Sequence, residues 1–151
     1  MVKEIILKEN SIYTILRDVS LKHLFLCFYK KKMIKKIFRL KEREVKKVLW
    51  KTKPFFSSWI VLNKKENKKS FNRFSIVIWA KSVNTNVTRV FFRRKFFDKI
   101  RESNLYLDNY KENKFYDFVF IVKKQTKLDR KKIETIKSFE NDLKFLIKKV
   151  K

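Results

Sequence analysis

Residues 74–101 read FSIVIWAKSVNTNVTRVFFRRKFFDKIR, and they form the most informative part of the chain. At their start, Phe74, Ile76 and Ile78 alternate with residues that point to the other face, as in a β-strand. Because the second face is apolar as well, the pattern indicates a central strand covered on both sides. A polar turn follows, and residues 87–102 then repeat with the period of an α-helix. The stretch therefore predicts a buried strand, a short turn and an amphipathic helix.

The predicted helix has separate apolar and cationic sides. At about 100° per residue, Phe92, Phe96 and Ile100 gather on the side that should pack on a sheet. The acidic residues Asp98 and Glu102 occupy a third sector, away from the arginines. The candidates for contacts with a nucleic-acid backbone are Arg89, Arg93, Arg94 and Arg101.

The turn before the helix adds further positive charge. Either Thr85 or Asn86 can cap the helix, and the N–H groups of the first turn then form a seat for phosphate. Lys81 lies at the edge of this seat. The ring of Phe97 projects among the arginines, and two interpretations stay open for it. The ring either packs beneath another segment of the chain or offers a stacking surface to an unpaired base.

Hydrophobic periodicity places further elements on both sides of this stretch. The predicted elements are a helix over residues 41–51, a strand over 55–63, a polar hairpin connection over 63–72, the strand over 73–79, a third strand over 117–122 and a C-terminal helix that ends near residue 150. The order α-β-β-α-β-α predicts a small α+β sandwich with helices packed on a short sheet. The apolar residues of segment 1–32 follow neither the helical nor the strand period. We therefore expect an N-terminal extension before a single domain over residues 33–151.

The chain is strongly basic. Its 151 residues include 41 Lys and Arg against 15 Asp and Glu, which gives a formal net charge of +26. The absence of Gly and the abundance of Lys, Asn, Ile and Phe are typical of an AT-rich genome, but that bias would raise the number of acidic residues too. The imbalance therefore indicates a polyanionic partner, a nucleic acid rather than a membrane surface. No apolar run approaches the roughly 20 residues that cross a bilayer.

The sequence offers few residues for catalysis. Without Gly it has neither a P-loop nor a dinucleotide-binding turn. His23 and Cys27 alone cannot build a zinc site, and a single cysteine excludes an internal disulfide framework and suits a reducing cytoplasm. Asp98, Glu102 and Asp117 lack the compact pattern of a two-metal site. We expect a cytoplasmic protein that binds RNA, holds no cofactor itself and takes no small-molecule substrate.

Four segments in order resemble the protein subunit of bacterial ribonuclease P, over nearly all of residues 33–151. They are RLKEREVKKVLWKTKPFFSSWIVLN (39–63), RFSIVIWAKSV (73–83), TRVFFRRKFFDKIRE (88–102) and YDFVFIVKKQTKLDRKKIE (116–134). In that order they resemble the family's opening helix and strand, its central strand, its Arg-rich helix, and its last strand with the start of its final helix. The succession of the four is more specific than any one of them.

The resemblance assigns roles to the arginines of the third segment. Arg89 matches the first residue of the family's Arg-Asn-Arg motif, while Val90 and Phe91 replace the other two. Arg93 and Arg94 match the basic pair that follows the motif. The resemblance thus implies that this helix contacts the catalytic RNA, through a motif that is only partly kept.

Two further sites follow from the resemblance. Lys81 matches the first Lys of a Ser-Lys-Lys signature at the end of the central strand, and Ser82 replaces the second. The family also has a cleft, lined by aromatic residues of the first helix, that holds the single-stranded leader of precursor tRNA. The residues assigned to this leader-binding cleft are Val45 and Leu49, which replace those aromatic residues, and Phe55, Phe56 or Trp59 as the alternative ring surface.

The family's fold includes an unusual left-handed β-α-β crossover, an exception to the usual rule. Its members assemble with a large catalytic RNA, whose bound Mg²⁺ ions carry out the hydrolysis that removes the 5′ leader from precursor tRNA. The resemblance therefore implies a non-catalytic protein component of an endonuclease. The main alternative is a ribosomal or ribosome-associated RNA-binding protein without a catalytic partner. The missing metal-ligand pattern argues against a third class, an autonomous nuclease.

Overall fold

The computed structural model describes residues 34–50, 52–105 and 114–150. The chain divides into two compact units, residues 1–33 and residues 34–151, and the described residues all belong to the second. The expectation of an N-terminal extension over residues 1–32 lies outside the described residues.

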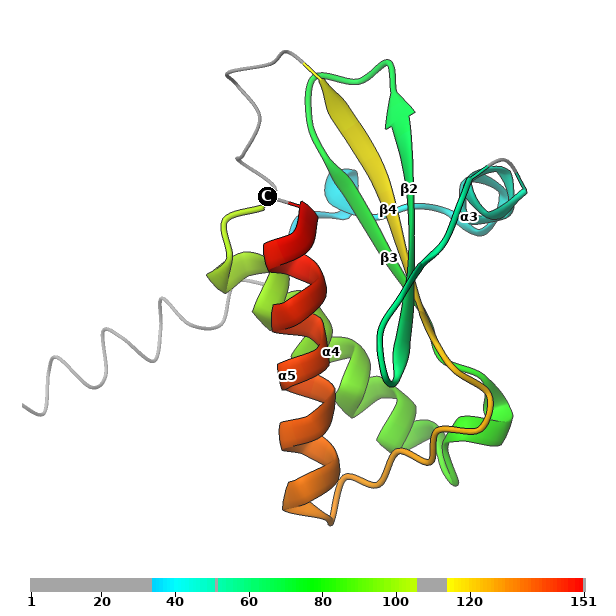
Figure 1. Cartoon of the computed structure of the whole chain (residues 1–151), viewed down its shortest axis with the longest axis vertical. Helices are drawn as coiled ribbons and strands as arrows, with labels where there is room; N and C mark the ends of the chain where they lie inside the picture. Colours follow the sequence, from blue (N-terminus) through cyan, green and yellow to red (C-terminus); the bar gives the residue numbers. More distant parts are fainter. Residues whose placement is uncertain (1–33, 51, 106–113, 151) are drawn as a thin grey trace, which may run out of the picture. The chain divides into compact units, whose positions relative to one another are not determined.

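The second unit is a mixed sheet with helices on both faces (Figure 1). Its described helices are α3 (Glu42–Leu49), α4 (Asn86–Glu102) and α5 (Ile133–Val150), with short 3-10 helices η1 (Lys36–Phe38) and η2 (Ala80–Ser82). Its strands are β1 (Phe55–Phe56), β2 (Ile60–Asn67), β3 (Arg73–Val77) and β4 (Phe115–Val122). They lie in the order β1-β2-β4-β3, and only the β3–β4 pair is parallel among the described strands. The predicted α+β class is confirmed.

The helices divide unequally between the two faces. Figure 1 shows α4 and α5 on one face of the sheet and α3 on the other. α4 connects β3 to β4, so these elements form a β-α-β unit whose two strands are neighbours in the sheet. The left hand of this crossover, which the resemblance implies, stays a prediction.

The strand predicted over residues 55–63 is in fact two strands. The two-residue β1 lies antiparallel to the start of β2, so the chain turns back between them. A carboxylate from α5 fixes this turn. Asp142 accepts hydrogen bonds from the backbone N–H of Trp59 (3.0 Å) and of Ile60 (2.9 Å), and from the hydroxyl of Ser57. The spacing of apolar residues in this segment could not predict the turn, because the side chain that stabilises the turn comes from α5 at the far end of the chain.

Two other predictions need correction. β2 continues to Asn67, which leaves a shorter connection than the predicted one over residues 63–72. β3 is an edge strand and not a central one, since β4 is its only neighbour among the described strands apart from a bridge between Phe74 and Arg39. The apolar pattern on both faces is nevertheless explained, because Phe74 and Ile76 are buried in the core on the α4–α5 side while Val77 packs against the smaller cluster on the α3 side. Alternation reports which faces are covered, and it does not report which strands pair.

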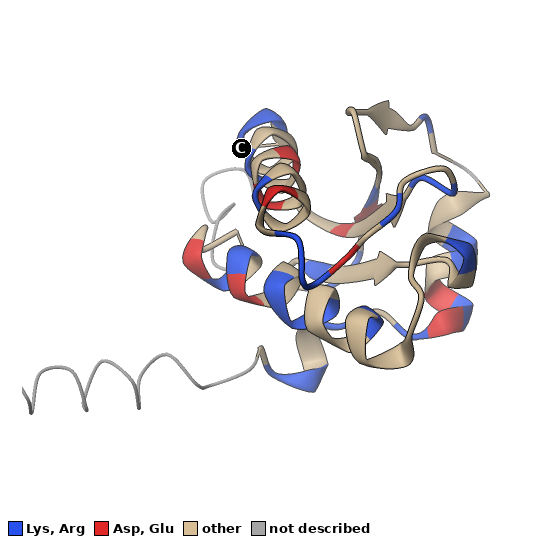
Figure 2. Cartoon of the chain, turned by 90° about the horizontal axis from the view of Figure 1, so that it is seen from below, with Lys and Arg blue, Asp and Glu red and all other residues tan. Residues whose placement is uncertain are grey.

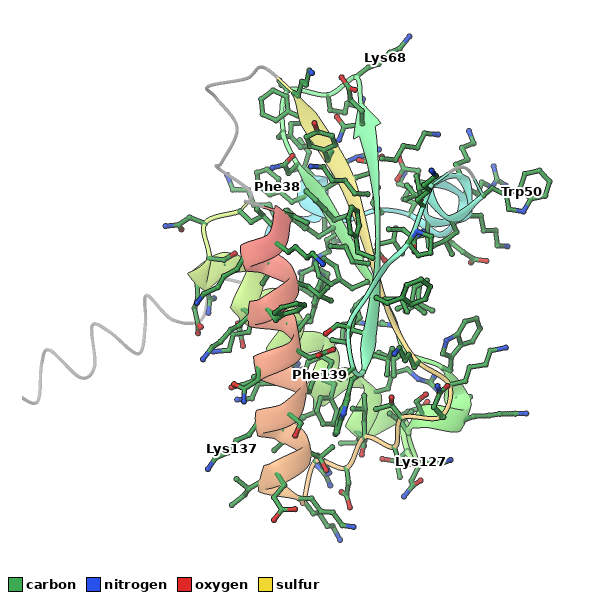
Figure 3. All side chains as sticks on the ribbon, in the orientation of Figure 1. Phe38, Trp50, Lys68, Lys127, Lys137 and Phe139 are labelled. Carbon is green, nitrogen blue, oxygen red and sulfur yellow. The ribbon has the colours of Figure 1, made fainter. Side chains whose placement is uncertain are left out.

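The main core lies between the sheet and the α4–α5 pair, and it is largely aromatic. Phe96 of α4 meets Phe120 of β4 with ring centroids 5.0 Å apart, and Phe92 meets Phe139 of α5 at the same distance. Figure 3 shows Phe139 between α5 and the sheet. Burying each such ring contributes about 1.5–3 kcal/mol. This confirms the apolar side predicted for α4 and fixes which side of that helix faces outward.

A smaller core lies between α3 and the opposite face of the sheet. Val45 and Val48 of α3 are buried there with Leu40 and Val119. α3 thus lies against β2 and β4.

Candidate nucleic-acid interface

The N-terminus of α4 is capped as one of the two sequence alternatives predicted. The hydroxyl of Thr85 accepts a hydrogen bond from the backbone N–H of Thr88 (3.2 Å). The cap sets where the helix begins, and the buried rings of Phe92 and Phe96 set its rotation. Cap and core together direct Arg93 and Arg94 away from the core.

The four arginines of α4 differ in how far their charge is already paired. Arg93 and Arg94 are exposed, and within the described part of the chain neither forms an ion pair. Arg89 is half-buried and donates to the side-chain oxygen of Asn86 (3.0 Å), which leaves its charge uncompensated. Arg101 instead forms an ion pair with Asp98 (2.9 Å). The expectation that Asp98 lies away from the arginines is therefore wrong, because residues three apart on a helix are neighbours.

Acidic residues also pair with the lysines on the side of α4 that faces α5. Lys95 contacts Glu140 of α5 (3.1 Å), and Lys99 contacts Glu102 (2.8 Å) and Glu140 (3.8 Å). The hydrogen bond to Glu102 raises the pKa of Lys99, against the opposing effect of partial burial. These pairs join α4 to α5, and the unpaired positive charge of α4 is left to the arginines on its other side.

A groove of about 470 Å³ follows the outer edge of β3. Its floor is the strand from residue 74 to residue 78, and one wall is α4, through Arg93 and Phe97. The opposite wall consists of residues 39–45, including Arg39, Glu42 and Val45. The one acidic side chain in this lining, that of Glu42, is paired with a lysine on its own helix.

Phe97 lies in this groove beneath a cation. The guanidinium of Arg39 sits 4.8 Å from the centroid of the Phe97 ring, and the ring also makes an edge contact with Phe96 (5.0 Å). Arg39 additionally donates to the backbone oxygen of Ile34 (2.9 Å). Packing beneath another segment is thus what the described residues display, and stacking of a base on Phe97 stays a prediction.

The structure does not bring the five residues of the predicted leader-binding cleft onto one surface. Val45 and Leu49 face the sheet from α3, and only Val45 reaches the groove. Phe55 and Phe56 are exposed on β1, and consecutive residues of a strand point to opposite faces. Trp59 packs against the core on the α4–α5 side. The groove instead uses Arg39 and the β3 edge, which the sequence analysis did not single out.

A partly buried polar network holds the α3 wall of the groove in place. Arg73, at the start of β3, donates to both carboxylate oxygens of Asp117 on β4 (2.9 and 2.8 Å) and contacts Glu44 of α3. Partial burial alone would raise the pKa of the Glu44 carboxyl. The hydrogen bond from the backbone N–H of Lys41 and the contact with Arg73 outweigh burial and hold that pKa below its usual range. The network ties α3 to the two parallel strands.

Lys81 belongs to a larger basic cluster, made by two loops that meet at the ends of β3 and β4. The backbone N–H of Leu128 donates to the oxygen of Ser82 (2.8 Å), and the ammonium of Lys127 donates to the oxygen of Lys81 (2.7 Å). Lys127, from the loop after β4, therefore stands beside Lys81, and the backbone oxygen of Lys124 lies 3.5 Å from the hydroxyl of Ser82 in the same turn. These lysines are part of the segment KKQTK (residues 123–127). Only the parallel pairing of β3 and β4 shows that they lie near Lys81. Figure 2, seen from this end, shows Lys and Arg segments in helices and loops alike.

Two positions that depart from the ribonuclease P protein pattern have structural roles in this chain. Ser82 is buried, and its hydroxyl donates to the backbone oxygen of Lys123 (3.2 Å), which joins the two loops. Phe91 is half-buried against the main core, with its ring 5.3 Å from that of Phe92. A cationic side chain at either position would lose these contacts.

Searches for two other kinds of site found none within the described ranges. No described helix combines the length and the apolar character needed to span a membrane. In the same part of the chain, no three His, Cys, Asp or Glu side chains are grouped so that they could hold a metal ion.

Comparisons with known proteins identify the fold. No protein-family model matches the chain, and no curated protein matches it. The fold matches the solved structure of the Staphylococcus aureus RNase P protein with a TM-score of 0.54 and 20% sequence identity, over 76% of this chain and 95% of that chain. It also matches a mutant of the Staphylococcus aureus RNase P protein with defective mRNA degradation activity (TM-score 0.52, 20% identity, 76% of this chain and 89% of that chain). The described domain therefore has the fold of the bacterial RNase P protein, as the sequence resemblance predicted.

Proposed function

We propose that this chain is the protein subunit of a ribonuclease P, which binds a catalytic RNA and the 5′ leader of precursor tRNA. The observation that carries the proposal is the position of Arg93. This residue shares the outward side of α4 with Arg94, and it also lines the groove along β3. One helix thus presents unpaired charge both to a groove and to the outer surface, which suits a protein that joins two RNA elements. The fold likeness supports the same assignment.

The cations outside the groove are assigned to the catalytic RNA. Lys81, Arg89 and Arg94 present point charges and planar guanidinium groups to solvent or near it, and these groups bind phosphate without reading sequence. Arg101 contributes less than expected from the sequence, because its charge is paired with that of Asp98. Catalysis belongs to the RNA, whose Mg²⁺ ions supply the hydrolytic chemistry, and the protein binds and orients.

The groove is assigned to the leader. Its volume of about 470 Å³ lies within the range of ligand sites, about 300–1,000 Å³. Arg39 and Arg93 bring positive charge to its two walls, and the edge strand β3 supplies its floor. Phosphates can contact the two arginines while bases face the strand and the ring of Phe97. Such contacts do not depend on sequence, as a leader of variable sequence requires.

The test is cleavage of precursor tRNA by the catalytic RNA of the same organism at low Mg²⁺, with and without this protein. We expect the protein to increase the rate of cleavage at the mature 5′ end. Arg39→Gln should weaken binding of precursor tRNA but leave binding of mature tRNA unchanged, because only the precursor carries a leader. Lys137→Gln is the matched control, since Lys137 is exposed on α5 and points away from the sheet (Figure 3).

Two results would contradict the proposal. If the protein binds RNA tightly but gives no gain in cleavage, the chain is a ribosome-associated binder that shares the fold. If Arg39→Gln weakens binding of precursor and mature tRNA equally, the groove does not hold the leader.

A further inference from the structure

An exposed tryptophan stands where the groove along β3 ends. The floor of the groove runs to Ile78, and Trp79 is the next residue of the chain. Its side chain is 40% exposed, although large aromatic side chains are usually buried. The ammonium of Lys124 lies 4.9 Å from the centroid of the Trp79 ring. Neither residue belongs to the sites assigned above.

The surroundings of Trp79 are cationic and are held in place by hydrogen bonds. Lys81 and Lys127 flank it on the two loops, and the hydrogen bond between them links those loops. The backbone oxygen of Trp79 accepts a hydrogen bond from the N–H of Ser82 (3.0 Å), which fixes the turn that carries the ring. Within the described residues, no carboxylate forms an ion pair with Lys81, Lys124 or Lys127. The ring therefore sits in a region of uncompensated positive charge.

We propose that Trp79 stacks an unpaired base of a single-stranded RNA that leaves the groove along β3, while Lys124 and Lys81 bind the flanking phosphates. This inference rests on the proposed function, because it extends the path assigned to the leader. A flat ring beside cations matches the chemistry of a nucleotide, whose base has a π-face and whose phosphate is anionic. A duplex hides its base faces, so this site would distinguish single strands from duplexes.

A lipid surface fits the observations less well. Membrane-surface binding needs an apolar face of several residues that can enter the bilayer interface. Trp79 is the one large hydrophobic residue among the four side chains of this site, and the other three are lysines. We therefore argue for RNA, and binding to anionic lipid vesicles serves as a test outcome.

The experiment measures binding of a labelled single-stranded RNA of about ten nucleotides to the full chain, by fluorescence anisotropy over a series of salt concentrations. We expect Trp79→Ala to weaken binding about tenfold or more, the effect of losing one base–aromatic stack, with no change in the salt dependence. Trp79→Phe should keep most of the affinity, because the ring is retained. Lys124→Gln should instead lower the slope of log affinity against log salt by about 0.7, the value for one phosphate contact to a single strand.

Three controls separate base stacking from loss of structure and from nonspecific binding. Trp50, the residue after α3, is 90% exposed and lies in none of the proposed sites, so Trp50→Ala should bind like the unmodified protein. Figure 3 shows Trp50 projecting from the end of α3. A duplex of the same sequence should bind Trp79→Ala and the unmodified protein equally. Equal thermal unfolding of the two proteins shows that the domain is intact.

Several results would overturn the inference. They are unchanged single-strand affinity in Trp79→Ala, an equal loss on the duplex, an equal loss in Trp50→Ala, or Trp79-dependent binding to vesicles of phosphatidylglycerol in place of RNA. If these occur while the protein still stimulates precursor tRNA cleavage, the proposed function stands and only the stacking site is refuted. If stimulation is absent but Trp79→Ala weakens single-strand binding, the stacking site stands and the proposed function fails.

Discussion

Replacing Arg93 and Arg94 together by glutamine tests whether the outward side of α4 binds RNA phosphates. Both residues are exposed and form no ion pair within the described part of the chain. Glutamine has nearly the helix propensity of arginine, so the helix should be preserved while two charges are lost. Arg101→Gln is the matched control, because it removes an arginine of the same helix whose charge Asp98 already pairs.

The expected magnitude follows from the number of unpaired cations. Six cations of the proposed interface form no ion pair with any described residue: Lys81, Arg89, Arg93, Arg94, Lys124 and Lys127. Each phosphate contact contributes about 0.7–0.9 to the slope of log affinity against log salt. Six contacts would lower the affinity about 10³-fold between roughly 50 and 200 mM salt, and the four that remain in the double variant about 10²-fold. The slope should therefore become shallower by about 1.5.

The assay is binding of the complex of the catalytic RNA with precursor tRNA over a potassium chloride series, by filter binding or anisotropy, because the six cations are assigned to both RNAs. The double variant should bind more weakly at low salt and converge toward the unmodified protein at high salt. Arg101→Gln should leave the slope nearly unchanged. Equal slopes for the double variant and the unmodified protein would refute the phosphate-binding role of this side of α4. A change of slope in Arg101→Gln as large as that of one exposed arginine would refute the argument from pairing.

Three further predictions concern the elements that support the site. Arg73→Met should lower the free energy of unfolding by about 3–5 kcal/mol, as urea unfolding would measure, because the buried carboxylate of Asp117 loses its cationic partner and keeps only the hydrogen bond from the Asn67 amide. The depressed pKa of Glu44 stabilises the fold fully above the usual glutamate pKa, about 4.3, and this contribution is lost as the pH falls through the lower pKa of the folded state. Comparing the acid unfolding of Glu44→Gln with that of the unmodified protein measures this contribution, which should be below about 1 kcal/mol because the side chain is one-third exposed. Thr85→Ala should cost about 1 kcal/mol of stability through loss of the cap of α4, seen as a lower midpoint of thermal unfolding.

Each of these predictions has an outcome that contradicts it. A loss below about 1 kcal/mol in Arg73→Met would mean that solvent reaches Asp117 after the change. Identical acid unfolding of Glu44→Gln and the unmodified protein would show that Glu44 is not held charged by Arg73. Thr85→Ser keeps the hydroxyl and should unfold like the unmodified protein, so an equal loss in both variants would mean that the cap is not the cause.

Local periodicity predicted the elements whose stabilising contacts form a regular pattern along the chain. The apolar side of α4 was predicted at Phe92, Phe96 and Ile100, and all three are buried. The same stretch offered Thr85 as one of two caps, and the structure chose it, since a cap bonds only three residues away. The arginines of α4 were found because helix geometry fixes which residues share a side.

The sequence was less informative wherever a partner lies far along the chain. The turn between β1 and β2 depends on Asp142, which is 82 residues from Ile60 and which the sequence did not single out. The edge position of β3 depends on strand pairing, and alternation of apolar residues is the same for edge and central strands. Phe55, Phe56 and Trp59 lie on different surfaces for the same reason, because the turn between β1 and β2 depends on a partner far along the chain.

For this protein, the sequence by itself determined the α+β class, the order of elements, the excess of positive charge and the cationic side of α4. Those properties depend on composition and on intervals of two to four residues, which any reader of the chain can measure. Only the tertiary structure decided that Arg93 shares a groove with Arg39, and that Lys124 and Lys127 join Lys81 and Trp79 at the ends of β3 and β4. The loop residues are brought together by the parallel pairing of β3 and β4, which are about 40 residues apart in the chain, and that pairing depends on a core built from the whole domain.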